Sequence, residues 1–358
     1  MILKKLFIRV FLMAFLCFTL LFTGVFAAFN TFMQDSHPNA DVPVIRDRED
    51  QEFDDQEAEP FERDQLRRLV NKSNRVNAVL LGLDGGRSDT MMFISFDPDE
   101  PQMDIISIPR DTYYPRKGYD GLGQKKINAA YAAHGAEGVK SIVSDLLYDV
   151  PVHYYVTLTY QGAASVVDAI GGVPMYIPQR MYYRDPYDSP PLVIDFAPGN
   201  HVLKGQDAVK FLRYRQAAPG SGAMDRNGDL GRVEAQQEFM KNAMKQAMSL
   251  GNLPTLASSA FRFVRTDVEL QDLVRYANQA RNMNPDTMTT FTLPGEARMQ
   301  SGLSYFFHHG LETRQLLIHI YSNGEVTADL EEARRLEEEA NGTADEEEEE
   351  TETDSSNS

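Results

Sequence analysis

The sequence has few of the residues on which several common kinds of site depend. Its only cysteine, Cys17, lies in the first apolar run, so neither a disulfide nor a cysteine-based metal site can form within one chain. No stretch has the form GxxxxGK(S/T), which excludes P-loop nucleotide hydrolases. No serine has histidine and aspartate partners at recognisable positions, so a serine hydrolase triad has no support.

An excess of basic residues is also missing from most of the chain. The net charge of −18 is concentrated in two acidic segments, residues 35–64 and 325–358, whereas residues 65–324 carry almost equal numbers of acids and bases. Because no basic stripe occurs outside the first nine residues, we expect no nucleic-acid partner. The neutral central part can still contain a basic pocket.

The N-terminal segment carries the one long apolar run. Lys4, Lys5 and Arg9 precede residues 10–29, which carry no charge. At about 1.5 Å per residue this run matches a hydrocarbon core roughly 30 Å thick, and the basic flank is expected to stay cytoplasmic. A cleaved signal peptide is the alternative, because residues 25–27 fit a cleavage site, but such apolar regions usually span only about 7–15 residues. We therefore expect a single-pass anchor in the cell membrane, with the N-terminus in the cytoplasm and the remaining chain outside.

Composition divides the chain into four parts. Residues 1–30 form the cytoplasmic basic flank and transmembrane anchor, and residues 31–75 form an acidic extracytoplasmic linker that contains little to bury. Residues 76–322 form the folded domain, in which no internal repeat or Gly/Ser linker occurs. Residues 323–358 are expected to be an acidic disordered tail.

Apolar periodicity in the central part alternates between strand and helix. The expected strands are residues 76–83, 90–97, 103–108, 153–159, 173–177, 289–293 and 303–307. The expected helices are residues 126–133, 136–147, 161–170, 205–213, 230–250, 254–261, 270–282 and 311–321. Strands interleaved with helices predict an α/β fold, a layered α-β-α domain with a central mixed sheet.

A charged corner interrupts the first two strands, in LLGLDGGRSDTMMF. Gly85 and Gly86 remove side chains where the first strand ends, so a ligand can approach the backbone there, and Asp84 and Asp89 flank them with Arg87 between. Mg²⁺ or Mn²⁺ is bound in this way, by one or two carboxylates together with a phosphate-bearing substrate. A loop that ligates a metal and a hairpin turn with a surface ion pair both remain open, because Asp-Gly is a common turn signal.

Arginines follow other elements in positions that suit an anion. Arg110 comes just after the strand in DIISIPRD, where open α/β sheets tend to bind ligands. Arg213 and Arg215 lie two apart in FLRYRQ, and Arg232 precedes Gln236 by one helical turn. A kinked backbone would aim Arg213 and Arg215 the same way, whereas a regular helix would splay them. Several converging guanidiniums suit a pyrophosphate, although a solvated salt bridge is the ordinary explanation for any single one.

Eight motifs occur in an order that resembles the LytR-CpsA-Psr family of bacterial cell-envelope proteins. They are NAVLLGLD, RSDTMMF, SIPRDTYY, KINAAYAAHG, VHYYVTL, VDAIGGVPM, PGNHVLKGQDAVKFLRYR and GRVEAQQEF. The resemblance is strong over about residues 76–250 and continues to about residue 322. It implies a membrane-anchored phosphotransferase that moves an anionic glycopolymer, such as teichoic acid or capsular polysaccharide, from a polyprenyl-pyrophosphate carrier to peptidoglycan. The acceptor would be the C6 hydroxyl of N-acetylmuramic acid, and the product a phosphodiester.

The resemblance also implies roles for individual residues. By motif position, Asp84 and Asp89 match the metal-binding aspartates, and with Arg110 they form the expected catalytic group. The expected pyrophosphate-binding residues are Arg87, Arg110, Arg213, Arg215 and Arg232, with Gln236 as a supporting polar contact. The cofactor would be Mg²⁺ or Mn²⁺, and either aspartate could take the proton of the incoming hydroxyl. The segment from Asp84 to Arg87 is shorter than in many members of the family.

Two other functions use the same residues. A lipid-pyrophosphate hydrolase would replace the sugar hydroxyl by water, and a non-catalytic envelope protein would only bind polyprenyl phosphates or glycans as a scaffold or regulator. A lipid donor further requires an apolar tunnel for its tail. The helical faces with Val139, Ile142 and Val143 and with Val166, Val167 and Ile170 are candidate walls, although such stripes are more often core packing.

Overall fold

The computed structural model describes residues 60–188, 191–214, 229–281 and 283–324. The apolar run at residues 10–29 and the acidic tail from residue 325 lie outside these ranges, so the expected anchor and disordered tail stay predictions. Within the described ranges, no helix has the length and apolar character that a membrane span requires.

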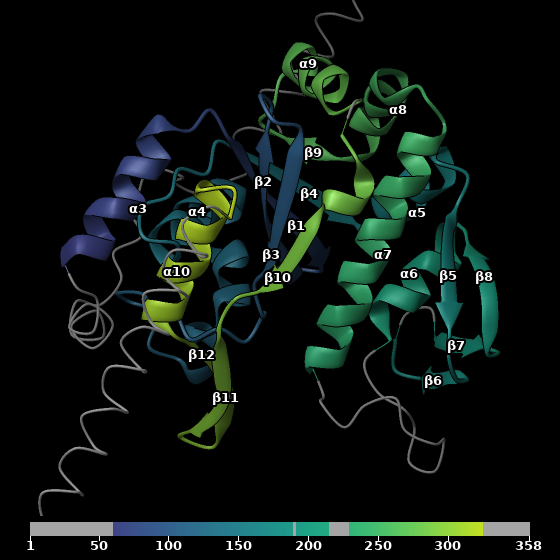
Figure 1. The fold of residues 1–358 in the computed structure, drawn as a ribbon. Helices are drawn as coiled ribbons and strands as arrows, with labels where there is room; N and C mark the ends of the chain where they lie inside the picture. The colour runs from purple at the N-terminus through teal and green to yellow at the C-terminus, as the bar shows by residue number, and fades with distance from the viewer. Residues whose placement is uncertain (1–59, 189–190, 215–228, 282, 325–358) are drawn as a thin grey trace, which may run out of the picture.

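A six-stranded sheet with the order β10-β3-β2-β1-β4-β9 forms the centre of the molecule (Figure 1). Its strands are β1 (Val76–Asp84), β2 (Arg87–Asp97), β3 (Gln102–Ser107), β4 (Tyr154–Thr159), β9 (Arg265–Thr266) and β10 (Thr289–Thr292). The β1 strand is antiparallel to β2 and parallel to β4, and β10 is parallel to β3. The predicted mixed sheet is therefore confirmed.

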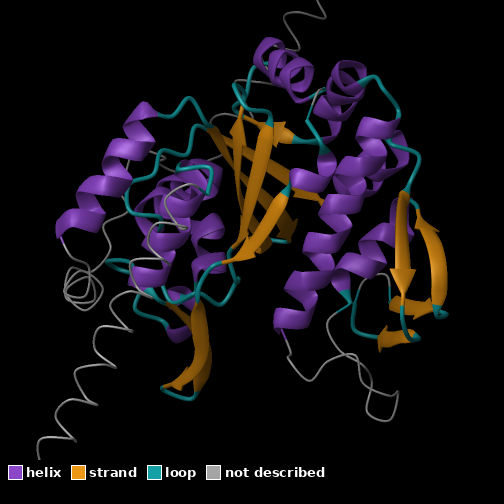
Figure 2. Cartoon of the chain, in the orientation of Figure 1, coloured by secondary structure: helices purple, strands orange, loops and turns teal. Residues whose placement is uncertain are grey.

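Helices lie on both sides of this sheet (Figure 2). One side carries α3 (Pro60–Lys72), α4 (Ala130–Leu146) and α10 (Gly310–Tyr321), and the other carries α5 (Tyr160–Ala169), α6 (Gly205–Arg213) and α7 (Asp229–Ser249). At one end of the molecule lie α8 (Leu253–Ala260) and α9 (Leu270–Ala280). The predicted α-β-α layering is observed, and α4 is kinked at Gly135, where φ is 63°, between the two helices that were expected.

Alternation along β1 separates the main core from the functional side of the sheet. Val79 and Leu81 are fully buried against α4, because successive strand residues point to opposite faces. Leu80 and Gly82 consequently face the other side, where α5 and α7 lie. Burying a core side chain of this size contributes roughly 1.5–3 kcal/mol, so the α4 face anchors the sheet.

Several elements were not predicted from the sequence. They are α3, the hairpin of β6 (Met181–Asp185) and β7 (Leu192–Phe196), the strand β8 (Gly199–Leu203) beside β5 (Val173–Ile177), and β11 (Gly295–Gln300) beside β12 (Leu303–His308). Short 3₁₀ helices span Leu122–Lys125, Ile127–Ala129, Phe261–Phe263 and Pro285–Thr287. The α3 helix lies in the stretch expected to be linker, and it buries Leu66 in the core beside α10.

Candidate functional site

A tight hairpin joins β1 to β2 at the charged corner. Asp84 pairs with Arg87 across Gly85 and Gly86, and Gly85 takes the left-handed φ of 59° that this turn requires. The expected strands at residues 76–83 and 90–97 left residues 84–89 as a loop. This prediction is wrong, because β2 already begins at Arg87. The Asp-Gly pair closes a hairpin, as the alternative interpretation held.

A β-bulge next to this turn sets the position of Asp89. Leu83 pairs with Ser88 and Gly82 pairs with Thr90, so Asp89 is the extra residue on β2. A Cβ atom on residue 82 would lie 2.9 Å from the Thr90 Cβ, so glycine is required opposite the bulge. The extra residue breaks the alternation of the strand and brings Asp89 to the edge of an apolar cavity.

A chain of ion pairs leads from Asp89 into the loop that follows β3. Arg110 Nη1 lies 3.4 Å from Asp89 Oδ2, and Arg110 Nε lies 3.8 Å from Asp111 Oδ1. Lys126 Nζ approaches the same Asp111 oxygen at 3.0 Å. The Arg110 Nε atom is buried and has no hydrogen-bond partner among the described residues, whereas the side chain as a whole is 23% exposed, so its other donors can meet a further anion.

Tyr160 connects the hairpin corner to the arginine at the end of α6. It follows the last residue of β4, and its hydroxyl interacts with the Asp84 carboxylate. The Arg213 guanidinium lies 4.5 Å from the centre of the Tyr160 ring, while Arg213 Nη2 pairs with Asp188 Oδ2 at 2.9 Å. Burial, followed by the hydrogen bond to Asp84, raises the pKa of Tyr160 to about 12. The hydroxyl is therefore protonated at neutral pH and donates to Asp84.

An apolar cavity of about 180 Å³ opens among these groups. Its polar lining is Asp89, Tyr160, Arg213 and Gln236, together with the hydroxyls of Thr90 and Thr159. Its apolar walls come from the sheet and from α5, α6 and α7, through Leu80, Met92, Leu158, Ala163, Val166, Val167, Ile170, Val209, Leu212, Phe239, Met240 and Ala243. The cavity thus has charged groups and a greasy interior side by side.

Only one of the two expected apolar stripes lines this cavity. Val166, Val167 and Ile170 of α5 are among its walls. The α4 stripe is core packing instead, because Val139, Ile142 and Val143 are fully buried on the opposite face of the sheet.

The structure brings together Asp84, Asp89, Arg110, Arg213 and Gln236 through these contacts. Gln236 is buried, and its amide nitrogen donates to the Leu212 carbonyl at 3.4 Å. Arg87 is exposed on the hairpin.

Two of the expected arginines are not fully described. Arg232 belongs to the first turn of α7, and its side chain lies outside the described part of the structure. Arg215 lies outside the described residues altogether. The helix α6 ends at Arg213, and Tyr214 is extended with φ −64° and ψ 117°, so the chain leaves the helix between Arg213 and Arg215.

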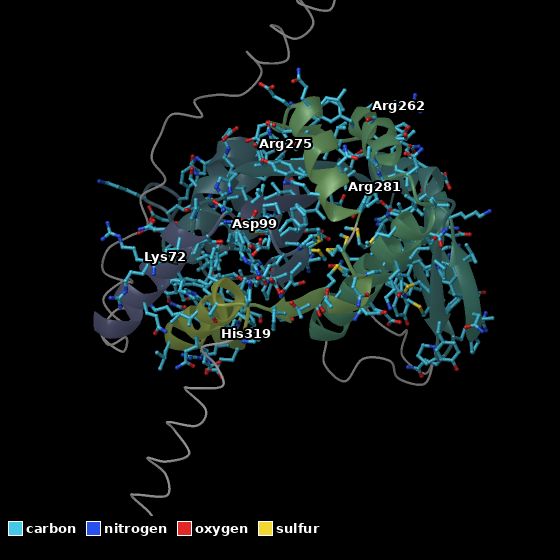
Figure 3. All side chains as sticks on the ribbon, turned by 45° about the horizontal axis from the view of Figure 1, so that its top comes forward. Lys72, Asp99, Arg262, Arg275, Arg281 and His319 are labelled. Carbon is cyan, nitrogen blue, oxygen red and sulfur yellow. The ribbon has the colours of Figure 1, made fainter. Side chains whose placement is uncertain are left out.

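Sequence reasoning missed Lys126, Tyr160 and Asp188. Tyr160 lies in a tyrosine-rich run that equally predicts strand packing, and Asp188 lies in a turn with no motif. Other arginines lie elsewhere: Arg262, Arg275 and Arg281 gather at the α8–α9 end (Figure 3), and none of them lines the cavity. These three arginines therefore lie apart from the cavity.

The carboxylates at the corner have the chemistry of a magnesium or manganese site. Asp84 and Asp89 both act on the Tyr160 hydroxyl, one by a hydrogen bond and the other by its charge. Among the described residues, no group of three or more His, Cys, Asp or Glu side chains is arranged to hold a metal ion. Two carboxylate groups with phosphate oxygens and water would suffice for Mg²⁺, so the residues present fit a cation that arrives with a phosphate substrate.

Comparisons with known proteins agree on one group. The model of the LytR_cpsA_psr family matches residues 40–319. The polyisoprenyl-teichoic acid–peptidoglycan teichoic acid transferase TagU of Oceanobacillus iheyensis is 29% identical over 295 residues, which cover 77% of this chain and 82% of the relative. TagU of Bacillus cereus is 35% identical over 205 residues, 54% of this chain and 61% of the relative.

Solved structures show the same fold. The crystal structure of TagV from B. subtilis matches with a TM-score of 0.56 at 23% identity, over 69% of this chain and 96% of that one. A structure of TagT bound to LI-WTA matches with a TM-score of 0.54 at 22% identity, over 71% of this chain and 92% of that one.

Proposed function

The chain belongs to the LytR_cpsA_psr family, and we propose that it transfers an anionic glycopolymer from a polyprenyl-pyrophosphate carrier to peptidoglycan. The names of its relatives, polyisoprenyl-teichoic acid–peptidoglycan teichoic acid transferases, support this reaction and favour teichoic acid as the polymer. The observation that carries the proposal is the apolar cavity whose polar lining includes Asp89, Tyr160 and Arg213. A lipid-linked pyrophosphate likewise combines an apolar tail with a charged diphosphate.

In the proposed complex the carrier tail enters the cavity and the diphosphate stays at the polar groups. Each buried methylene of the tail contributes about 0.8 kcal/mol. The guanidiniums of Arg110 and Arg213 are connected to the Asp84–Asp89 corner through their contacts with Asp89 and Tyr160. They bind the non-bridging oxygens of the diphosphate, a geometry that suits the planar fork of arginine.

The transfer step exchanges one phosphorus–oxygen bond for another. The C6 hydroxyl oxygen of N-acetylmuramic acid attacks the phosphorus that is joined to the polymer sugar. The bond from this phosphorus to the bridging oxygen breaks, and polyprenyl monophosphate leaves with that electron pair. Asp84 or Asp89 takes the hydroxyl proton, while the arginines stabilise the charge that develops on the leaving oxygen.

Asp84 and Asp89 would also hold the divalent cation, Mg²⁺ or Mn²⁺. When bound, this ion would neutralise charge on the diphosphate oxygens as the lipid phosphate leaves. The same corner then serves the ion and the incoming hydroxyl, which is consistent with Asp89 being lifted out of the strand register by the bulge.

The proposed place of this reaction is the outer side of the cell membrane. The support is the uncharged run at residues 10–29 behind three basic residues, which would anchor the chain with its N-terminus in the cytoplasm. An anchored enzyme would meet both the lipid carrier and the peptidoglycan acceptor.

A reconstituted reaction tests the proposed function. The full chain, in vesicles with a lipid-pyrophosphate-linked teichoic acid donor and peptidoglycan fragments, is expected to place polymer on the muramic acid sugar. Asp89→Asn should lower the rate of transfer roughly 10²–10³-fold, because a charge at the reacting phosphate site is lost. The matched control is Asp195→Asn on β7, which breaks the exposed ion pair between Asp195 and Arg180.

Two outcomes contradict the proposal. Release of free phosphorylated polymer without sugar attachment would show a hydrolase. Wild-type transfer by the Asp89→Asn variant would show that this corner does not take part in the chemistry.

A further inference from the structure

We propose that Tyr160 is a positioning residue that holds the two halves of the site together, with its hydroxyl on Asp84 and its ring under Arg213. The inference rests on the proposed function, because Asp84 belongs to the corner that would bind the cation and Arg213 to the group that would bind the diphosphate. Tyr160 acts through these two side chains.

The sheet register places Tyr160 next to Asp84. Leu83 of β1 pairs with Thr159 of β4 in the parallel part of the sheet. The next residues in the chain, Asp84 and Tyr160, are therefore neighbours at this end of the two strands. The Thr159 hydroxyl accepts a hydrogen bond from the Gly162 backbone N–H at 3.1 Å. This N-cap fixes the start of α5 and with it the direction of the tyrosine.

The two contacts of Tyr160 use different parts of the side chain. The hydroxyl interacts with the carboxylate of Asp84, which follows the strand residue paired with Thr159, and the ring face receives the guanidinium of Arg213 at 4.5 Å from its centre. A cation attracted to a ring face and a hydroxyl bonded to a carboxylate at the ring edge do not compete for the same atoms. One side chain therefore fixes the spacing between an acidic group from β1 and a basic group from α6.

Without the ring, Arg213 would keep its ion pair with Asp188. Asp188 lies in the turn between β6 and β7 and holds the guanidinium at 2.9 Å. Tyr160 and Asp188 thus both fix the position of Arg213. Without the ring, the guanidinium would contact Asp188 at the β6–β7 hairpin and would no longer be directed towards the corner where the diphosphate is expected.

Two substitutions separate the two contacts. Tyr160→Phe keeps the ring and removes the hydroxyl, so the affinity for Mn²⁺ of the purified full chain loaded with farnesyl diphosphate is expected to fall roughly tenfold, as for loss of a hydrogen bond to a charged group. Its affinity for farnesyl diphosphate, measured without metal, should stay within about twofold of wild type. Tyr160→Leu removes both contacts and should weaken both ligands roughly tenfold.

Titration calorimetry with Mn²⁺ and with farnesyl diphosphate gives the readouts, and the thermal midpoint of each variant checks folding. Tyr154→Phe on β4 is the matched control, because its hydroxyl lies 3.4 Å from the Tyr276 hydroxyl and Tyr154 does not line the cavity. Unchanged Mn²⁺ binding by Tyr160→Phe would overturn the inference, as would wild-type farnesyl diphosphate binding by a folded Tyr160→Leu. The phenylalanine variant decides the question alone if the leucine variant does not fold.

These binding readouts are independent of the transfer reaction. If wild-type protein binds both probes and the variants lose them as expected, yet no polymer reaches peptidoglycan, the proposed function fails and the role of Tyr160 stands. If wild-type protein transfers polymer and the variants bind both probes normally, the function stands and the inference fails.

Discussion

At the scale of single residues, Arg110 and Arg213 are each already paired with a carboxylate. Arg110 pairs with Asp89 at 3.4 Å, and Arg213 pairs with Asp188 at 2.9 Å. These pairs prevent the cations from repelling one another before the substrate arrives. They also mean that a diphosphate must compete with an internal anion for each guanidinium.

The Asp188 pair leads to a prediction with an unusual sign. Asp188→Asn should increase the affinity for farnesyl diphosphate, by about 5–10-fold, because Arg213 no longer has to give up a charged partner. Titration calorimetry on the full chain measures the change. Asp207→Asn, which removes an exposed pair with Lys210 on α6, is the control. Weaker binding by the Asp188 variant would show that the aspartate positions Arg213 for the ligand and does not compete with it.

What the sequence predicts at this scale depends on whether a residue has a local signature. Asp84, Asp89 and Arg110 could be singled out because glycines, a strand end and a proline mark their places. Tyr160 could not, because its role comes from the parallel pairing of β1 with β4 and from an arginine on α6. The bulge at Asp89 is likewise visible only when two strands are paired.

At the scale of elements, the proposed lipid site depends on the spacing between α5, α7 and the sheet. Ala163 and Ala243 line the cavity from the two helices, and their small side chains leave space that larger ones would fill. Two methionines, Met92 from β2 on the sheet and Met240 from α7, form an adaptable part of the wall. The volume is therefore set by side-chain size on two helix faces.

Filling this space tests its use. Ala243→Phe is expected to lower the affinity for farnesyl diphosphate at least roughly tenfold, because the ring occupies the volume of several methylenes worth about 0.8 kcal/mol each. Inorganic pyrophosphate, which has no tail, should bind as it does to wild type. Ser249→Phe at the exposed end of the same helix is the matched control. Equal loss of both ligands would indicate a distorted site rather than a filled cavity.

Element prediction succeeded where a segment was mainly apolar or had helical spacing, and failed for short strands in which polar residues interrupt the apolar pattern. The strand at residues 173–177 and the helix at residues 205–213 have the bounds that were expected. The β6, β7 and β8 strands are each five residues long and alternate exposed side chains with buried or half-buried ones, many of them polar. Such segments resemble turns in sequence, and only their pairing stabilises them.

At the scale of the whole molecule, stability depends on pH through His134 on α4, which lies near a buried arginine in the connection from β3 to α4. Arg116 is 2% exposed, and its Nη2 donates to the Gln124 carbonyl at 2.5 Å. His134 on α4 stacks edge-on with Tyr119, which also lies under Arg116. Burial, followed by the charge of Arg116, lowers the pKa of His134 below its ordinary value of 6.5.

Because of this lowered pKa, the free energy of unfolding depends on pH in the acidic range. Below pH 6.5 the unfolded chain binds a proton at His134 that the folded chain resists, so the free energy of unfolding falls as the pH drops from 6.5 towards the folded pKa. His134→Gln should flatten that part of the stability curve, measured by urea unfolding between pH 5 and pH 8. His309→Gln, on an exposed histidine that pairs with Glu312, is the control. An unchanged pH slope in the His134 variant would contradict this assignment.

The central claim is that one site on this chain holds a diphosphate at the Asp84–Asp89 corner and a polyprenyl tail between α5 and α7. The most direct measurement is a crystal structure of the full chain with farnesyl diphosphate and Mn²⁺. We predict diphosphate oxygens on Arg110 and Arg213, an anomalous Mn²⁺ peak between the two aspartates, and the tail along Val166 and Ala243. A diphosphate bound elsewhere, such as at the arginines of the α8–α9 end, with no tail in the cavity, would contradict the account.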